Sequence, residues 1–285
     1  PYLPPAVVLN QDFLCVEGTG GAVWRPSILF SKFVCGEEGR RSFPLAGKSV
    51  LEISSGLGLG AIVAFHLGAS PVVATDMDSD NSPLTLLRRN VSENCGRASA
   101  TLAEEDYDDD SEEEEENDGG GEASPSPQQQ GRTGEAATRG AIGGGERPVT
   151  VGVTHPSAPP HRGRPRPRPR RSPPRVQRLR WGDREQLEEA LANFDGAGPD
   201  VVLACDVVFD DDLLPALTDT LAEACARLTT QGTRPRLCVS NQERNRTRED
   251  NFFAGLAERL GGGEWQTLHR QQDVSLQVFT TSSEV

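Results

Sequence analysis

The chain has few histidines and no clustered cysteines. Four His and six Cys occur among its 285 residues. The cysteines form no C-x-x-C pair and no Cys/His group at the spacing of metal ligands. A structural zinc site is therefore not expected. Scattered, unpaired thiols fit a reducing compartment, which favours the cytoplasm, the nucleus or both.

Long apolar segments are also missing. No run reaches the length of a transmembrane helix, and no secretory signal pattern opens the chain. We expect no membrane association, and we expect a monomer. The sequence begins without Met, so a longer precursor stays open.

Positive charge is in deficit, because 29 Lys and Arg face 43 Asp and Glu, for a net charge of −14. The acidic excess extends beyond the low-complexity part of the chain. An acidic fold does not favour nonspecific binding to nucleic-acid phosphates. It suits a basic partner, such as a protein surface that presents lysine.

Residues 96–175 form a low-complexity segment of Glu, Asp, Gly, Ser, Pro and Arg. Carboxylates dominate residues 104–118, and arginines alternate with prolines within 162–175. Such blocks bury too little apolar area to offset the entropy of ordering, so we expect the whole insert to be disordered. Its Arg-Pro run could be a nuclear-import signal or an RNA contact; a solvated linker, partly neutralised by the acidic block, is the favoured interpretation. Residues 1–95 and 176–285 then form one domain.

Strands and helices alternate through the rest of the chain, which predicts an α/β fold with a mostly parallel sheet and helices on both faces. A short strand or hairpin is expected near the N-terminus, within 6–16. The last two strands should form an antiparallel pair. The expected strands are 49–53, 72–75, 176–181, 200–206, 236–240, 264–268 and 274–280, and the expected helices are 27–35, 59–67, 82–94, 185–191, 211–228 and 249–260.

The most informative motif is the apolar run from Val50 that breaks into glycines before Ala61. A second apolar run follows and ends at Asp76. This strand–loop–helix–strand pattern is half of a nucleotide-binding fold. Gly56 and Gly58 would let the backbone approach a ligand closely. Asp76 is placed to accept hydrogen bonds from a ribose, so the chain should bind an adenosine-containing cofactor.

The glycines alone fit NAD as well as S-adenosylmethionine, because Asp76 follows Gly56 at the dehydrogenase spacing. Glu52 favours S-adenosylmethionine, since a carboxylate inside a strand needs a positive or hydrogen-bonding partner such as an amino acid's ammonium. Capping of nearby backbone N–H groups is the alternative role for Glu52. The acid-ended strand at Asp206 and the closing hairpin point the same way.

Several motifs together resemble the family 16 class I methyltransferases. They cover essentially all of the chain outside the insert. That family uses S-adenosylmethionine, chiefly to methylate protein lysines, on a Rossmann-like seven-stranded sheet with an antiparallel C-terminal hairpin. The motifs are Trp24-Arg-Pro, Val50-Leu-Glu-x-x-Ser-Gly-x-Gly-Leu, Ala74-Thr-Asp76, Arg89-Asn-Val-x-x-Asn94, Leu179-Arg-Trp-Gly182 and Asp206-Val-Val-Phe209.

The resemblance implies a cofactor site. Its glycine loop would hold the amino-acid end of S-adenosylmethionine, and the acid of the next strand would hold the ribose. Ordinary core packing is the alternative for the two tryptophans and the methionine. The implied cofactor residues are Trp24, Glu52, Ser54, Gly56, Gly58, Asp76, Met77, Trp181 and Cys205.

The resemblance also implies that Asp206 orients the lysine amine and that Phe209 offers a ring face to the lysine side chain. A helix cap is the alternative for Asp206. The family usually has glycine where this chain has Ser54, and tyrosine where it has Phe209. These departures leave open a weak enzyme or a non-enzymatic interaction module, beside a class I methyltransferase that acts on a small molecule or nucleic acid.

Overall fold

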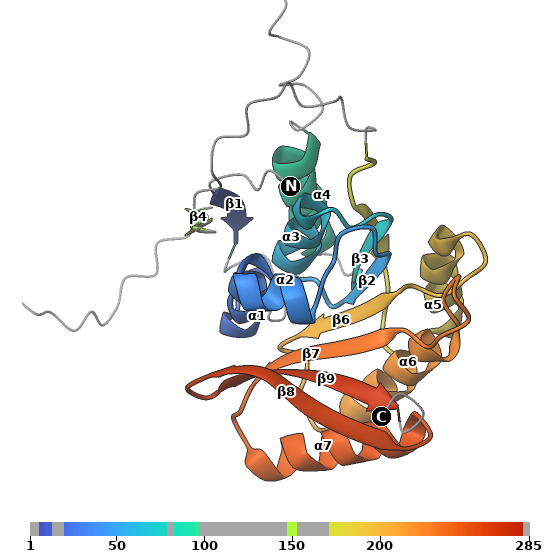
Figure 1. Cartoon of the computed structure of the whole chain (residues 1–285). Coiled ribbons are helices and arrows are strands. Elements are labelled where there is room, and N and C mark those ends of the chain that lie inside the picture. Colours follow the sequence, from blue (N-terminus) through green and yellow to red (C-terminus); the bar gives the residue numbers. More distant parts are fainter. Residues whose placement is uncertain (1–5, 13–19, 79–82, 97–146, 153–170, 282–285) are drawn as a thin grey trace, which may run out of the picture.

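The computed structural model describes residues 6–12, 20–78, 83–96, 147–152 and 171–281. Its centre is a seven-stranded sheet of order β5-β3-β2-β6-β7-β9-β8 (Figure 1). The first five strands in this order are parallel, and β9 and β8 form the antiparallel edge. The predicted fold class is therefore confirmed. The strands are β2 (Val50–Ile53), β3 (Val72–Asp76), β5 (Arg175–Arg178), β6 (Val201–Cys205), β7 (Arg236–Gln242), β8 (Gly263–Gln271) and β9 (Val274–Thr281).

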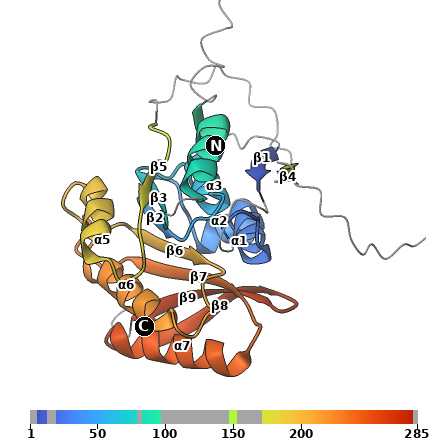
Figure 2. The same cartoon turned by 180° about the vertical axis from the view of Figure 1, so that it is seen from behind.

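Helices cover both faces of the sheet (Figures 1 and 2). Alternate residues of β2 face opposite cores, because strand side chains alternate in direction. Val50 packs into one core, and Leu51 and Ile53 pack into the other. The first core contains α1 (Arg25–Cys35), α3 (Leu59–Leu67) and α4 (Pro83–Val91), and the second contains α5 (Arg184–Leu191), α6 (Leu214–Ala226) and α7 (Arg246–Arg259).

Most element boundaries agree with the sequence prediction, and α3 matches it fully. The short helix α2 (Glu37–Ser42) was not expected. Helix α6 begins at Leu214 rather than at Asp211, because Pro215 lies in its first turn, where the missing N–H costs nothing. Asp211 and Asp212, which lie in the range expected to be helical, therefore precede it.

Two parts of the insert are ordered, which the prediction of disorder over 96–175 did not include; residues 97–146 and 153–170 lie outside the described residues. Strand β4 (Arg147–Gly152) pairs antiparallel with β1 (Ala6–Gln11), with Ala6 opposite Gly152. Arg171 also belongs to the ordered structure: its guanidinium donates to the carbonyl of Phe65 at 2.7 Å and lies 5.3 Å from the Phe65 ring centre. Composition gave no signal of either feature, since residues 147–152 are a short stretch between the two charge blocks and Arg171 lies inside the Arg-Pro run.

Two asparagines support the other edge of β1 as a neighbouring strand would. The Asn94 side chain accepts from the amide of Val8 at 3.1 Å and donates to its carbonyl at 2.7 Å. Asn90 does the same for Asn10, at 2.7 and 3.2 Å. The Asn90-x-x-x-Asn94 spacing places both side chains on one side of the chain where α4 continues into the short π-helix η1 (Ser92–Gly96). This gives that motif a structural role.

The carboxyl ends of β3, β2, β6 and β7 lie at one edge of the sheet. The chain order reverses at β2, which lies between β3 and β6. Open α/β sheets bind their ligands outside the carboxyl ends at such a switch point. The glycine loop after β2 therefore lies where a cofactor site is expected.

Candidate active site

The loop between β2 and α3, residues 54–58, is a tight turn with left-handed backbone at three positions. The φ angles are 56° at Ser54, 52° at Gly56 and 84° at Gly58. The Ser55 amide donates to the carbonyl of Thr75 on β3 at 2.8 Å, and the Gly58 amide donates to the Ser55 carbonyl at 2.8 Å. Glycine adopts such angles freely, whereas serine is strained there.

The two predicted glycines have different surroundings. A Cβ at Gly58 would lie 2.4 Å from Cδ1 of Leu87, so the Leu87 side chain on α4 would have to shift. A Cβ at Gly56 would meet nothing closer than the Gly20 carbonyl at 3.6 Å. Only Gly56 therefore leaves room for a ligand to approach the loop backbone.

Asp76, the last residue of β3, holds the loop from the side. Its Oδ2 accepts from the Gly56 amide at 2.6 Å and its Oδ1 accepts from the Met77 amide at 2.8 Å. The carboxyl is buried, at 8% exposure. Burial raises its pKa to about 6, against the lowering effect of the two amides. Each oxygen keeps a lone pair that can accept from a hydroxyl group.

Glu52 lies beneath the loop and does not reach its open side. It is 1% exposed, and its Oε2 accepts from the Ala61 amide in the first turn of α3 at 2.8 Å. A Cβ at Gly60 would come within 2.2 Å of Oε1, so the neighbouring turn is shaped around this carboxyl. Desolvation raises the Glu52 pKa to about 8. This geometry is the helix-capping role that the sequence left as the alternative.

Ser54 and Trp181 meet across the open end of the sheet. The indole N–H of Trp181 donates to the Ser54 hydroxyl at 2.9 Å. The Trp181 ring also lies 6.0 Å from the ring of Phe209, between ring centres. The loop, the segment after β5 and the segment after β6 are thus joined through three predicted residues.

Two further predicted cofactor residues lie at strand ends. Met77 follows Asp76 and is 40% exposed. Cys205 ends β6 and is partly buried. Burial is the largest effect that raises the pKa of its thiol, and the nearby Glu52 adds to it. The thiol is therefore held in its neutral form, and no disulfide joins the described cysteines.

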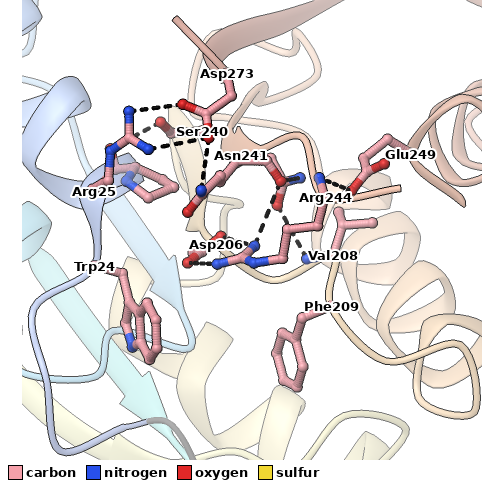
Figure 3. A network of polar contacts seen from close by, with 12 residues as sticks. Trp24, Arg25, Asp206, Val208, Phe209, Ser240, Asn241, Arg244, Glu249 and Asp273 are labelled. Atoms are coloured by element: carbon pink, nitrogen blue, oxygen red, sulfur yellow. Dashed lines mark hydrogen bonds and ion pairs between the residues drawn. The ribbon is translucent and has the colours of Figure 1, made fainter. Parts of the chain in front are cut away.

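Asp206 directly follows β6 and has a left-handed backbone, with φ of 60°. Its amide donates to the Ser240 carbonyl on β7 at 2.7 Å. Its side chain is 4% exposed, and both oxygens are bound by Arg244, at 2.6 Å from Nη1 and 2.7 Å from Nη2 (Figure 3). The N-terminal boundary of α6 is Leu213, so the helix-cap alternative for Asp206 is wrong.

Aromatic side chains lie on two sides of this ion pair (Figure 3). Trp24 is 38% exposed, and the Arg244 guanidinium carbon lies 5.9 Å from its ring centre. Phe209 is held through its carbonyl, which accepts from Arg248 at 2.9 Å. Trp24 thus approaches the site beside Arg244.

Sequence reasoning missed the polar residues that hold Asp206 in place. Arg244, in the loop before α7, ends the sequence motif Val239-Ser-x-x-x-Arg244, to which no role was assigned. Asn241 is 2% exposed and accepts from the Val208 amide at 3.3 Å, which fixes the turn between Asp206 and Phe209. Arg25 pairs with Asp273 at 2.7 Å. It lay inside the Trp24-Arg-Pro motif without an assigned role.

Residues 171–259 match the model of the family described as lysine methyltransferase. Over this segment the chain is similar to that family. The match confirms the resemblance that the motifs predicted. It includes Trp181, Asp206, Phe209 and Arg244, whereas the glycine loop and Asp76 lie before it.

Two solved structures with a similar arrangement are described as a methylase and a methyltransferase. The ribosomal protein L11 methylase of Lactobacillus delbrueckii subsp. bulgaricus is 13% identical, with a TM-score of 0.42; the match covers 90% of this chain and 76% of that one. Magnesium protoporphyrin IX methyltransferase of Synechocystis PCC 6803, solved with bound S-adenosylmethionine, is 10% identical, with a TM-score of 0.40, and the match covers 90% and 80% of the two chains. No curated protein matches the chain.

Membrane and metal features were searched in the same described ranges. No helix there combines the length and apolar character of a membrane span. In those ranges no three His, Cys, Asp or Glu side chains gather as a metal site would require.

Proposed function

We propose that the protein is an S-adenosylmethionine-dependent methyltransferase that acts on lysine side chains of a protein substrate. One observation carries the proposal: the family-matched segment presents Asp206 and Phe209 at the same sheet edge as the glycine loop, and Trp181 contacts both halves. A cofactor held by the loop would thus lie beside the groups that would receive the substrate.

The residues at the loop fit S-adenosylmethionine. Asp76 is buried and oriented by two amides, and it offers the free lone pairs that a ribose diol requires. Gly56 opens the loop backbone, and Met77 and Trp181 supply apolar surface beside it. Glu52 supports the loop from below through Ala61. When bound, the cofactor supplies an electrophilic methyl group on a positively charged sulfur.

The residues around Asp206 fit a lysine side chain. The rings of Trp24 and Phe209 can cover its aliphatic part, and a ring face favours nearby positive charge by about 0.5–2 kcal/mol. Asp206 can accept a hydrogen bond from the amine through its remaining lone pairs. Phe209 has no hydroxyl, so it orients by packing alone. Alignment and exclusion of water are what such a displacement chiefly needs from a protein.

NAD remains the second ligand that the loop could hold, but the described histidines do not favour hydride chemistry. His66 bonds to the Asn94 carbonyl at 3.0 Å, and His269 stacks on Phe33. His66 lies on α3, and the Phe33 ring that His269 contacts lies on α1, so both contacts are away from the loop and from Asp206. We therefore keep NAD as an outcome of the binding test.

The test is transfer of a tritiated methyl group from S-adenosylmethionine to the protein of a cell lysate, followed by acid hydrolysis. We expect labelled Nε-methyllysine with the wild type. Asp206→Asn should reduce the label at least 10-fold, whereas Asp219→Asn, on the exposed side of α6, should retain it. Label in another amino acid, in nucleic acid only, or nowhere would contradict lysine methylation.

A further inference from the structure

The ion pair of Arg244 with Asp206 is the feature that the proposed function does not explain. A permanently charged guanidinium binds both oxygens of the carboxylate that would receive the lysine amine. Lysine presents a cation too, so the site already contains the charge that its substrate would bring. A fork of two parallel N–H donors also fixes the carboxylate plane.

The chemistry of amine methylation gives this arrangement a use. The lone pair of the amine nitrogen forms the new N–C bond as the methyl carbon's bond to the departing thioether breaks; the methylammonium product then loses its proton to water. A protonated lysine has no lone pair to give. A carboxylate without a partner would favour the ammonium form of a nearby lysine, whereas a neighbouring cation favours the neutral amine.

We propose that Arg244 is a positioning residue that balances the charge of Asp206, so that the site accepts lysine as a neutral amine. The inference rests on the proposed function. Arg244 leaves each Asp206 oxygen one lone pair, so the carboxylate can still orient the amine while the pair as a whole is neutral.

The local construction supports a fixed position for Arg244. Its backbone amide donates to Glu249 at 3.1 Å, and its guanidinium lies 5.9 Å from the Trp24 ring centre. Glu249 is 5% exposed and also accepts from the Asn245 amide, so its charge is engaged at the start of α7. Glu249 thus fixes the backbone of Arg244, and the Trp24 ring and Asp206 fix its guanidinium.

Other charged groups around the pair have hydrogen-bonded or oppositely charged partners of their own. Asp273, in the turn between β8 and β9, is bound by Arg25 at 2.7 Å and by Gln242 at 2.7 Å. Arg248 pairs with Asp211 at 2.7 Å. The titratable and charged groups facing the pair are Arg25 at the start of α1, Cys205 on β6, Asp211 before α6, Glu249 and Arg248 on α7, and Asp273.

A binding experiment tests the charge balance without any turnover. The probe is n-butylammonium chloride, a mimic of the lysine side chain, titrated by NMR at pH 7.5 into wild type, Arg244→Met and the double variant Arg244→Met/Asp206→Asn. We expect Arg244→Met to bind the probe at least 10-fold more tightly than the wild type, and the double variant to lose that gain. Equal affinity in the wild type and Arg244→Met would overturn the inference.

A second test measures the rate of methyl transfer to lysate protein as a function of pH. Arg244→Met should lose at least 10-fold in rate at pH 7 and recover most of it by pH 9.5. Arg244→Lys keeps the charge but loses the two-donor fork, so it should keep the shape of the wild-type pH profile at a lower rate. Arg259→Met removes an arginine that pairs with Asp219 at the far end of α7, and the pH profile of this variant should match that of the wild type.

The two proposals fail in different ways. A wild type that binds S-adenosylmethionine yet labels no lysine contradicts the proposed function and removes the basis of the inference. A wild type that labels lysine, with an Arg244→Met profile parallel to it, contradicts the inference alone. Unfolding curves of each variant, taken at both ends of the pH range, exclude loss of folded protein as the cause.

Discussion

The indole N–H of Trp181 donates to the hydroxyl of Ser54 at 2.9 Å, although the two residues are 127 positions apart. Ser54 stands where the family usually has glycine, and its φ of 56° is the strained angle that made the serine a departure. The hydrogen bond of the Ser54 hydroxyl offsets part of this backbone strain, because it joins the segment after β5 to the glycine loop. Serine at this position therefore has a specific hydrogen-bond partner.

Substitution at Ser54 should separate the strain from the hydrogen bond. Ser54→Ala keeps the strained angle and loses the bond, so we expect a loss of about 1 kcal/mol in the free energy of unfolding. Ser54→Gly loses the bond but removes a strain of about 1–2 kcal/mol, so it should lie near the wild type. Urea unfolding measures both. An alanine variant as stable as the glycine variant would show that the strain is not real.

The two loop glycines should respond differently to alanine. Gly58→Ala adds a Cβ 2.4 Å from Leu87 at a φ of 84°, so we expect a loss of about 2–4 kcal/mol from strain and overpacking. Gly56→Ala meets no atom closer than 3.6 Å and should lose only about 1–2 kcal/mol. Adding Leu87→Ala to Gly58→Ala should give a double variant more stable than the summed single effects predict.

Glu52 should make stability depend on pH. Its folded pKa of about 8 lies above the ordinary 4.5, so between these values the folded chain holds a proton that the unfolded chain releases. Stability therefore falls as pH rises through this window and levels off above pH 8. Glu52→Gln removes this pH dependence. The free energy of unfolding of the variant, relative to that of the wild type, should therefore increase by a few kcal/mol from pH 4.5 to 8.

Urea unfolding at successive pH values, without cofactor, checks this expectation. Glu189→Gln, at an exposed position on α5, is the matched control and should run parallel to the wild type. A constant difference between Glu52→Gln and the wild type across the window would mean that the buried carboxyl does not titrate there.

Strand β4 should protect alternate amides of β1. The amides of Val8 and Asn10 bond to Asn94 and Asn90, which leaves those of Val7, Leu9 and Gln11 for β4. Replacing residues 147–152 with a Gly-Ser repeat should speed hydrogen exchange at these three amides at least 10-fold. The two asparagine-bonded amides should change less. Uniform exchange across β1 would argue against the pairing.

The sequence predicted the layout of this fold well because hydrophobic periodicity and glycine breaks decide it locally. The parallel strands, α3 and the closing hairpin followed from such patterns. The β1–β4 pair did not, because it joins residues 6–11 to 147–152 across a charged segment, and composition gives no register for so distant a contact.

The candidate site divides in the same way. Asp76 and Asp206 could be found because each carboxylate ends an apolar run. The fork of Arg244 on Asp206 and the bond of Trp181 to Ser54 could not, since neither partner carries a local signal of the other. Glu52 was found, but its burial beneath the loop depends on the packing of α3 against β2.

Binding of S-adenosylmethionine is the central requirement of the proposed function. Titration calorimetry of the folded chain at pH 7.5 with S-adenosylmethionine, and separately with NAD, tests it most directly, with Asp76→Ala as the site variant and Asp219→Asn as the control. We predict micromolar binding of S-adenosylmethionine by the wild type and the control, loss of binding in Asp76→Ala, and no heat with NAD. Binding of NAD in its place, or no binding of S-adenosylmethionine by well-folded protein, would contradict the account.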